Sequence, residues 1–296
     1  MHVNCCPVCQ SELGVPHLVR EMMLGTREEF LYFECSECGC LSLAETPSNL
    51  DRYSTNGQFL LESKTLSMAR RFKNSVYLSR LSFLVNWRQQ ADLDLIRRVH
   101  LTKNMNLLDV GCGSGRLLGD LRELGYKARG VDSSVPADVQ DRFGVRVERK
   151  TLAEITDSFD VILFRHSLEL LPIDMLKLAR EHINKNGSCV ACIPLASWAW
   201  RAYATDWAQL NAPRHLLVHS SKSFSLLSEK SGFRIERVVF DSTEFQFWAS
   251  DSYQRNIPLT EMIEPTRSQR SRMRRLAAAL NLRQQGDTAQ FYLKPA

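Results

Sequence analysis

Residues 107–118 read LLDVGCGSGRLL, and this stretch decides the fold of the chain around it. Its apolar first half predicts a buried strand and its second half a helix from Gly115 onward, so the glycines occupy a strand-to-helix turn. Glycines there let the backbone turn sharply and approach a ligand beside the amides of the helix start. Asp132 ends the next expected strand, KARGVD, where a carboxylate can accept hydrogen bonds from both hydroxyls of a ribose. The stretch therefore predicts a nucleoside-binding turn.

From residue 106 onward, strand-like and helix-like patterns alternate. Strands are expected at residues 107–111, 127–132, 145–149, 159–165, 188–193, 233–240 and 289–293, and helices at residues 115–124, 173–184 and 222–231. Such alternation builds a doubly wound, mostly parallel sheet and indicates the α/β class. Two segments interrupt it, an aromatic-rich one at residues 194–220 and another at 242–286.

The glycine turn and the segments after it resemble known motifs. LLDVGCGSGRLL resembles motif I of class I S-adenosylmethionine-dependent methyltransferases, and GVDSS (130–134) resembles their second motif. FDVILFRHSLELLP (159–172) is similar to the strand-four region of small-molecule members, although Leu170 replaces the second histidine of their HxLEHL pattern. NAPRHLLVHSSKSFSLLSEKSGF (211–233) is similar to a stretch of methyltransferases associated with bacterial glycan biosynthesis. The resemblance covers about residues 105–260.

This resemblance implies a Rossmann-like fold with a seven-stranded sheet, and S-adenosylmethionine as the cofactor. The cofactor-binding residues that it implies are Asp109, Gly111, Gly113, Gly115, Asp132, Ser133 and Arg165. A nicotinamide or flavin site is the alternative for the glycine turn. The acidic residue two positions before the first glycine argues against that alternative, and the flanking strand and helix argue against a turn without any ligand.

Six of the nine cysteines lie in the first 40 residues, where two CxxC pairs are separated by 25 residues. Two such knuckles supply four thiolates to a tetrahedral Zn²⁺. The predicted zinc ligands are Cys6, Cys9, Cys35 and Cys38. Cys5 and Cys40 are neighbours that can replace a ligand of their own knuckle. Four thiolates leave no open position for a substrate, so the zinc is expected to be structural; incidental thiols are the alternative.

A third CxxC pair, Cys189 and Cys192, falls on an expected buried strand. Side chains three positions apart on a strand face opposite sides, so these are expected to be two core thiols. Clustered cysteines in a reducing compartment favour metal binding over disulfides. The N-terminus lacks a secretory pattern, and no apolar run approaches the ~18 residues of a membrane span, so a cytoplasmic protein is expected.

The 296 residues suffice for one large α/β domain and a small appendage. We expect a zinc ribbon-like module at residues 1–45, a helical linker or cap at 46–104, and a methyltransferase domain at 105–296 with insertions at 194–220 and 242–286. The apolar positions that suggest helices in the linker are Ala69, Phe72, Val76, Phe83, Trp87, Leu93, Ile96 and Val99.

Residues 265–286 contain six arginines and no acidic residue. Met273, Leu276 and Leu280 are expected to form the buried stripe of a helix there. The arginines are expected to form a solvated basic face. The alternative is a surface for a phosphate-bearing substrate or a membrane-associated glycolipid.

Methyl transfer from a sulfonium is an in-line displacement, for which a protein supplies alignment and, where the acceptor needs it, a base. Residues 165–169 after strand four, residues 194–219 after strand five and the start of the linker around Tyr53 are expected near the methyl group. The catalytic candidates are His215, Tyr203 and His166, with Glu169 and Asp206 after them. His215, in the PRH segment, is the first choice because imidazole titrates near neutrality. The alternative is that Arg214 and His215 orient the loop or an anionic substrate.

The leading hypothesis is a methyltransferase for a small-molecule or glycan-type acceptor, such as a nucleotide-linked sugar. The net charge of +5 suits an anionic acceptor without indicating nucleic acid. A zinc-ribbon RNA methyltransferase is the second hypothesis; residues 1–45 are not notably basic, and RHSLE stands where nucleobase-amine enzymes carry Asn-Pro-Pro-Tyr. A non-catalytic S-adenosylmethionine-binding protein is the third.

Overall fold

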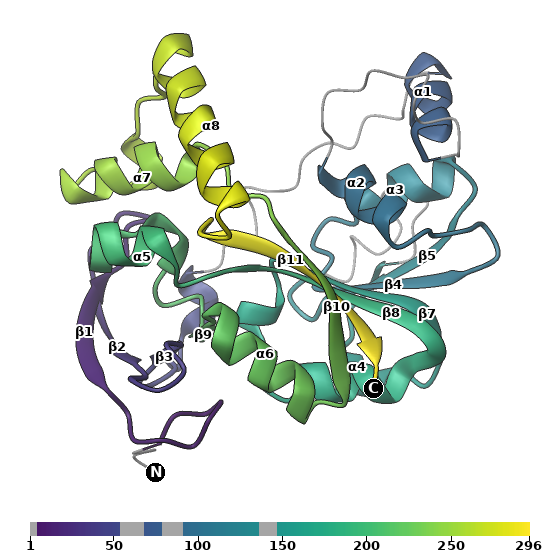
Figure 1. Ribbon diagram of the computed structural model, residues 1–296, viewed down its shortest axis with the longest axis horizontal. Helices are drawn as coiled ribbons and strands as arrows, with labels where there is room; N and C mark the ends of the chain where they lie inside the picture. Colours follow the sequence, from purple (N-terminus) through teal and green to yellow (C-terminus); the bar gives the residue numbers. More distant parts are fainter. Residues whose placement is uncertain (1–4, 54–67, 79–90, 136–146) are drawn as a thin grey trace.

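A sheet of seven strands crosses the larger part of the molecule in the computed structural model, which describes residues 5–53, 68–78, 91–135 and 147–296 (Figure 1). Its strands in spatial order are β10 (Phe233–Phe240), β11 (Thr288–Pro295), β8 (Ile183–Pro194), β7 (Phe159–Arg165), β4 (Asn106–Val110), β5 (Lys127–Val131) and β6 (Val147–Glu148). Only the pairings of β11 with β8 and β10 are antiparallel within this sheet. The expected seven-stranded, mostly parallel sheet is confirmed.

The strand boundaries agree with the sequence except at the start of β8. A helix was expected to run to residue 184, but α4 (Met175–His182) ends earlier and β8 begins at Ile183. Ile183 pairs with Phe159 at the start of β7. Pairing with a strand far away in sequence therefore overrides the helical pattern at this boundary.

Helices cover both faces of the sheet (Figure 1). The pair α2 (Ala91–Arg98) and α3 (Arg116–Glu123) packs on one face, and α4 and α6 (Ser221–Lys230) pack on the other. Consecutive strand residues alternate between the two cores. The thiols of β8 follow this rule, because Cys189 packs with the α4–α6 core and Cys192 with the α2–α3 core, as expected.

The order of the strands reverses between β4 and β7. From β4 the chain continues outward to β5 and β6, and from β7 it continues in the opposite direction to β8. Ligands of doubly wound sheets bind beyond the carboxyl ends of the strands at such a switch point. The glycine turn follows β4 directly, so the topology positions it at this point.

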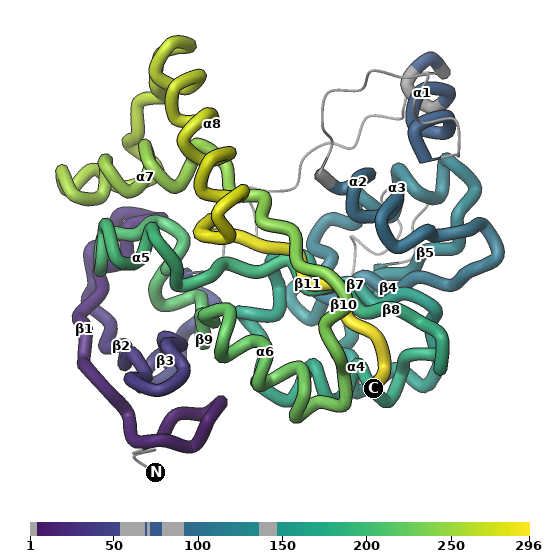
Figure 2. The backbone as a smooth tube through the Cα atoms, in the orientation of Figure 1, coloured from purple at the N-terminus to yellow at the C-terminus, as the bar shows by residue number. Residues whose placement is uncertain are grey.

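The N-terminal cysteine region builds a second, four-stranded sheet. Its strands are β1 (Val15–Arg20), β2 (Glu29–Glu34), β3 (Leu41–Leu43) and β9 (Leu217–Val218). Strand β9 comes from the aromatic-rich segment and pairs with β3 through Leu41 opposite Val218. Tyr32 and Trp207 share one buried cluster between the two chain segments. Figure 2 shows the purple N-terminal strands beside the green segment that carries α5 (Trp198–Tyr203) and β9. The expected appendage and the expected insertion thus share one sheet and one core.

Short elements connect these parts. They are η1 (Leu50–Tyr53), η4 (Leu152–Glu154), η5 (Leu168–Leu170), η6 (Ala204–Asp206), η7 (Ala208–Leu210), α7 (Phe245–Gln254) and η8 (Leu259–Glu261). In the expected linker, α1 (Met68–Leu78) and α2 confirm the helices, but Phe72 is 71% exposed. Phe83 and Trp87 lie outside the described residues. No helix within the described ranges is long and apolar enough to cross a bilayer.

The arginine-rich segment forms α8 (Arg267–Leu282), as expected, but its buried stripe differs. Leu276 was expected to be buried and is 48% exposed, whereas Ala277 is 2% exposed. Ala277 shares a helix face with the half-buried Met273 and Leu280, which precede and follow it by four and three residues. A small residue can face a neighbouring element at close range, and this contact is invisible in a pattern of large apolar side chains.

Candidate functional site

The glycine turn leaves open space where a ligand approaches. Gly111 has φ +71°, and a Cβ there would lie 2.4 Å from the Cβ of Ser167, which packs against the turn. Gly113 has φ +54°, and a Cβ there would meet no described atom within 4 Å. Gly115, with φ +71°, is the N-cap residue directly before α3. Gly111 is therefore needed for packing, and Gly113 exposes its backbone to the site.

The carboxylate of Asp132 lies across the glycine turn. One oxygen accepts a hydrogen bond from the Gly113 N–H at 2.8 Å. The other accepts from the N–H and the hydroxyl of Ser134 at 2.9 and 2.6 Å. A carboxylate has about four lone-pair sites, so beside these three hydrogen bonds about one acceptor position remains for a ribose hydroxyl.

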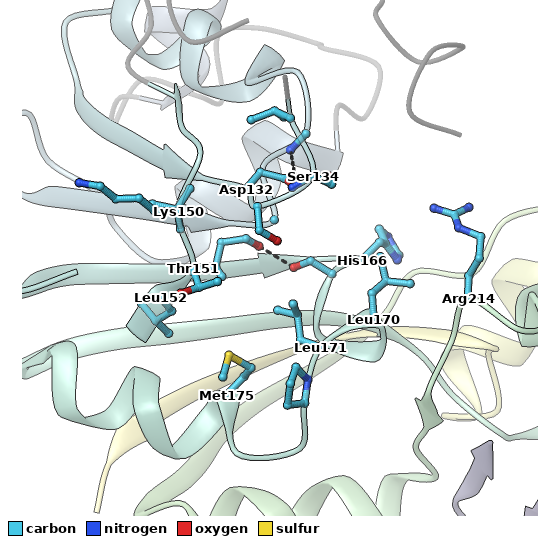
Figure 3. Close-up of a pocket in the computed structure, with 18 of the residues that line it drawn as sticks. Asp132, Ser134, Lys150, Thr151, Leu152, His166, Leu170, Leu171, Met175 and Arg214 are labelled. Carbon is cyan, nitrogen blue, oxygen red and sulfur yellow. Dashed lines mark hydrogen bonds between the residues drawn. The ribbon is translucent and has the colours of Figure 1, made fainter. Parts of the chain in front are cut away.

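A cavity of about 600 Å³ extends from this turn, within the usual range for small-molecule sites (Figure 3). The residues that line it include Leu50, Asp51, Gly111, Gly113, Asp132, Ser133, Lys150, Thr151, Leu152, His166, Ser167, Leu171, Met175 and Arg214. In Figure 3, Leu152 and Met175 lie on one side with Asp132, Arg214 lies on the other, and His166 stands between. The cavity thus has an apolar end beside Asp132 and a cationic end at Arg214.

Asp109 and Arg165 form an ion pair that is not part of the cavity lining. The two groups approach to 3.5 Å, and Arg165 also contacts Asp92 of α2 at 2.5 Å. Burial raises the pKa of Asp109 to about 6, although Arg165 acts in the opposite direction. The pair connects β4, β7 and α2 behind the glycine turn.

Glu169 is a buried carboxyl group between two histidines. Its Oε1 lies 3.9 Å from Nδ1 of His166 and 4.0 Å from Nε2 of His215. Its Oε2 has no hydrogen-bond partner among the described residues. Burial raises the pKa of Glu169 to about 8, so the group is mostly protonated at neutral pH.

The two histidines occupy different environments. The His166 side chain is 59% exposed and lines the cavity, and its backbone has φ +54°, a conformation that is rare outside glycine. His215 is buried and is not part of the cavity lining. Its Nε2 lies 3.3 Å from the side-chain Nδ2 of Asn211. Burial lowers the pKa of His215 to about 3, and Arg214 adds to this effect. The first-choice base of the sequence analysis therefore lies behind the cavity, and the adjacent Arg214 lines it.

The remaining catalytic candidates lie away from the cavity lining. Tyr203 donates a hydrogen bond to Asp251 of α7 at 2.9 Å. Asp206 accepts one from Arg20 of β1 at 2.8 Å. Both therefore connect the aromatic-rich segment to its neighbours.

The N-terminal module supports the segment that carries Arg214. Tyr32 donates a hydrogen bond from its hydroxyl to the His215 carbonyl at 2.7 Å, and the Leu216 N–H donates to the Glu169 carbonyl at 2.8 Å. The Arg214 guanidinium lies 2.9 Å from the sulfur of Met23. Strand β9 follows these residues and pairs with β3 of the module.

The four predicted zinc ligands converge. The sulfurs of Cys6, Cys9, Cys35 and Cys38 all lie within 4.8 Å of one another. Zn–S bonds of about 2.3 Å at tetrahedral angles place sulfurs about 3.8 Å apart, so this arrangement fits a zinc ion. Cys5 is exposed, whereas the sulfur of Cys40 lies 3.4 Å from that of Cys6. Cys40 is thus a fifth thiol at the edge of the site.

A family model described as "Methyltransferase domain" matches residues 84–238, about half of the chain. The chain belongs to this methyltransferase family. The enzyme is an S-adenosylmethionine-dependent methyltransferase, and the open space at Gly113 and the carboxylate of Asp132 fit that cofactor. Among curated protein sequences, none matches the chain.

Solved methyltransferase structures share the fold of this enzyme. Geranyl diphosphate C-methyltransferase from Streptomyces coelicolor A3(2) has a TM-score of 0.50 and 13% identity, covering 79% of this chain and 86% of its own. The mycolic acid cyclopropane synthase CmaA1 has a TM-score of 0.45 and 15% identity, with 69% and 82% covered. The mitomycin 7-O-methyltransferase MmcR has a TM-score of 0.40 and 16% identity, with 66% of this chain and only 50% of that longer protein covered. At 13% identity, the likeness to the geranyl diphosphate enzyme shows the fold alone.

Several cavity residues were not expected from the sequence. Thr151 and Leu152 come from the turn after β6. The sequence TLAE at residues 151–154 carries the Thr-x-x-Glu capping signature that signals this turn, and both capping contacts are present. Leu50 and Asp51 come from η1, at the start of the linker around Tyr53 that was expected near the methyl group.

Proposed function

We propose that this methyltransferase acts on a small, glycan-type acceptor, such as a nucleotide-linked sugar, at the His166 end of the cavity. The observation that carries the proposal is the cavity of about 600 Å³, which runs from Asp132 past His166 to Arg214. A cavity of this size suits a cofactor and a small acceptor group together. The polar residues at its far end suit a hydroxyl-bearing, charged molecule better than an apolar one.

The expected cofactor residues divide into two roles. We assign the ribose hydroxyls of the cofactor to Asp132, with Ser133 beside it. We assign the adenine ring of the cofactor to the apolar lining at Leu152 and Met175. S-adenosylmethionine supplies an electrophilic methyl group when bound. Asp109 and Arg165 maintain the position of the glycine turn through their ion pair.

His166 is the best-placed base for an acceptor hydroxyl. It lines the cavity, and its Nδ1 faces Glu169, so Nε2 remains to accept the proton. Glu169 lies 3.9 Å from Nδ1 and restricts the orientation of the ring, while burial lowers the pKa of His166 below its ordinary value, so the ring is neutral and can accept a proton at neutral pH. His215 contacts the same carboxyl from the other side and acts as a positioning residue.

The test combines an acceptor screen with histidine variants of the full-length enzyme. Methyl transfer from labelled S-adenosylmethionine should appear with a nucleotide sugar or a related glycan precursor. His166→Ala should then lower turnover by about 10²–10⁴-fold while S-adenosylhomocysteine affinity is unchanged, because the base touches only the acceptor. His182→Ala, at the end of α4 beside the Asp157 carbonyl, is the matched control.

Two results would change the assignment. If His215→Ala or Tyr203→Phe produces the large loss of turnover and His166→Ala does not, the base is that residue. If RNA is methylated and none of the small acceptors is, the RNA methyltransferase hypothesis replaces this one.

We also propose a structural zinc ion bound by Cys6, Cys9, Cys35 and Cys38. All four thiols converge, and a four-thiolate site has no open position for chemistry. The zinc would stabilise the module whose sheet includes β9. Thiolate ligands need a reducing environment, which supports the cytoplasm as the proposed location.

A further inference from the structure

Arg214 presents a guanidinium to the acceptor end of the cavity. The side chain is half-buried, and its only recorded hydrogen bond among the described residues goes to the sulfur of Met23 at 2.9 Å. A thioether is a weak acceptor, whereas a guanidinium carries five N–H donors in a planar fork. Most of the hydrogen-bonding capacity of Arg214 is therefore available to a ligand.

The charges around Arg214 do not neutralise it. No carboxylate of the described residues lies within 4.0 Å of its guanidinium. Glu169 contributes little negative charge at neutral pH, since burial raises its pKa to about 8. Glu21, whose two oxygens accept hydrogen bonds from Leu24 and Thr26, attracts Arg214 only from beyond ion-pair distance, and burial outweighs this attraction and lowers the pKa of Arg214. A half-buried cation in this situation favours an anionic ligand.

The other ionic groups of the cavity are arranged differently. Lys150, the second cation of the lining, is paired with Glu148 at 2.8 Å. Asp132 accepts a hydrogen bond from the glycine turn, and Asp51 is exposed to solvent. In Figure 3 the Arg214 guanidinium lies on the side of His166 opposite to Asp132. The guanidinium of Arg214, which has no ion-pair partner among the described residues, thus lies beside the proposed base and away from the proposed ribose site.

We propose that Arg214 binds an anionic group of the acceptor, a phosphate or a carboxylate, and so aligns the acceptor next to His166. This inference rests on the proposed function of the cavity and names the substrate class. A planar guanidinium fork matches two oxygens of either group. The module supports this position through Met23, Tyr32 and the pairing of β3 with β9.

The test measures anion binding to the full-length enzyme saturated with S-adenosylhomocysteine. Inorganic pyrophosphate and malonate are titrated separately in a calorimeter, so that the phosphate and carboxylate sources are distinguished. Wild type and Arg201→Gln, which removes an exposed arginine of α5, should bind at least one anion saturably. Arg214→Gln should weaken that binding at least ten-fold, and Arg214→Lys should restore part of it, because lysine keeps the charge without the fork.

Three results of the binding experiment would overturn the inference. In the first, Arg214→Gln binds the anion as tightly as wild type, and in the second, wild type binds neither anion saturably. In the third, Arg214→Gln loses S-adenosylhomocysteine affinity by ten-fold. The last result would assign Arg214 to the cofactor. Methyl transfer to a neutral sugar that Arg214→Gln leaves unchanged would overturn the inference while the proposed function stands. Arg214-dependent anion binding without methyl transfer to any glycan acceptor would support the anion site at Arg214 and contradict the proposed function.

Discussion

The carboxylate of Asp132 connects the turn after β4 with the turn after β5, and both of its oxygens accept protein hydrogen bonds. Asp132→Ala removes these bonds and the proposed contacts with the ribose. The affinity for S-adenosylhomocysteine should fall by about 2–4 kcal/mol in calorimetry, the value of two hydrogen bonds to a charged group. Glu229→Ala, on the exposed face of α6, should bind normally. Unchanged affinity in Asp132→Ala would remove this carboxylate from the cofactor site.

Glu169 gives a prediction about stability and pH. Its pKa is about 8 in the folded protein against an ordinary value of 4.5, so the folded state holds a proton that the unfolded state has released. The stability contribution of Glu169 is therefore complete below pH 4.5 and is lost as the pH rises toward 8. Glu169→Gln has no such titration, so its free energy of unfolding should increase relative to wild type across this range.

Urea unfolding at three pH values between 5 and 8 measures this difference. The limiting slope is about 1.4 kcal/mol per pH unit for one proton. His215 titrates in the opposite sense but is present in both proteins, so it cancels in the comparison. Glu229→Gln should show no pH-dependent difference from wild type. A constant difference between Glu169→Gln and wild type would mean that Glu169 is ionised in the folded protein.

At the scale of elements, the two CxxC pairs of the N-terminal module and the proposed acceptor segment, residues 211–220, are connected through a sheet. Removing zinc should loosen β3 and then β9, because Leu41 pairs with Val218. Cys35→Ser/Cys38→Ser should lose about one equivalent of zinc per chain, and amide exchange should increase at residues 211–220. S-adenosylhomocysteine binding should persist, since the glycine turn belongs to the large sheet.

Cys5→Ser is the matched control for this prediction, because Cys5 is an exposed neighbour of the knuckle. This variant should retain zinc, and the amide protons of β9 should exchange as slowly as in wild type. Full zinc retention by the double variant would identify different ligands, with Cys40 the first to test because its sulfur lies 3.4 Å from that of Cys6. Loss of zinc without faster amide exchange in β9 would contradict the connection between the N-terminal module and the proposed acceptor segment.

For the whole molecule, the cofactor site joins elements from most of the chain. Its lining includes residues of η1, the turns after β4, β5 and β6, and the segment before β9. Ligand binding should therefore stabilise the folded enzyme as one unit. S-adenosylhomocysteine at 100 times its Kd adds about 2.7 kcal/mol, which for a chain of this size raises Tm by about 4–5 °C. Asp132→Ala should show no such shift at the same concentration, and a wild-type Tm that does not move would contradict cofactor binding.

The sequence by itself determined the features that depend on local spacing. The alternation of patterns predicted the large sheet, and the glycine turn and Asp132, which the sequence brought together as one site, line the same cavity. Two CxxC pairs identified four thiols that converge in space. These predictions succeeded because a strand period, a glycine turn and a knuckle are each defined by residues a few positions apart.

Only the tertiary structure decided which side chains of the PRH segment reach the cavity. Arg214 lines it and His215 does not, because the pairing of β9 with β3 and the contact of Tyr32 with the His215 carbonyl orient this segment. Such placements depend on contacts between residues more than a hundred positions apart, and no local pattern records them. A motif therefore predicts the chemistry that a segment carries, while packing decides which of its side chains faces the substrate.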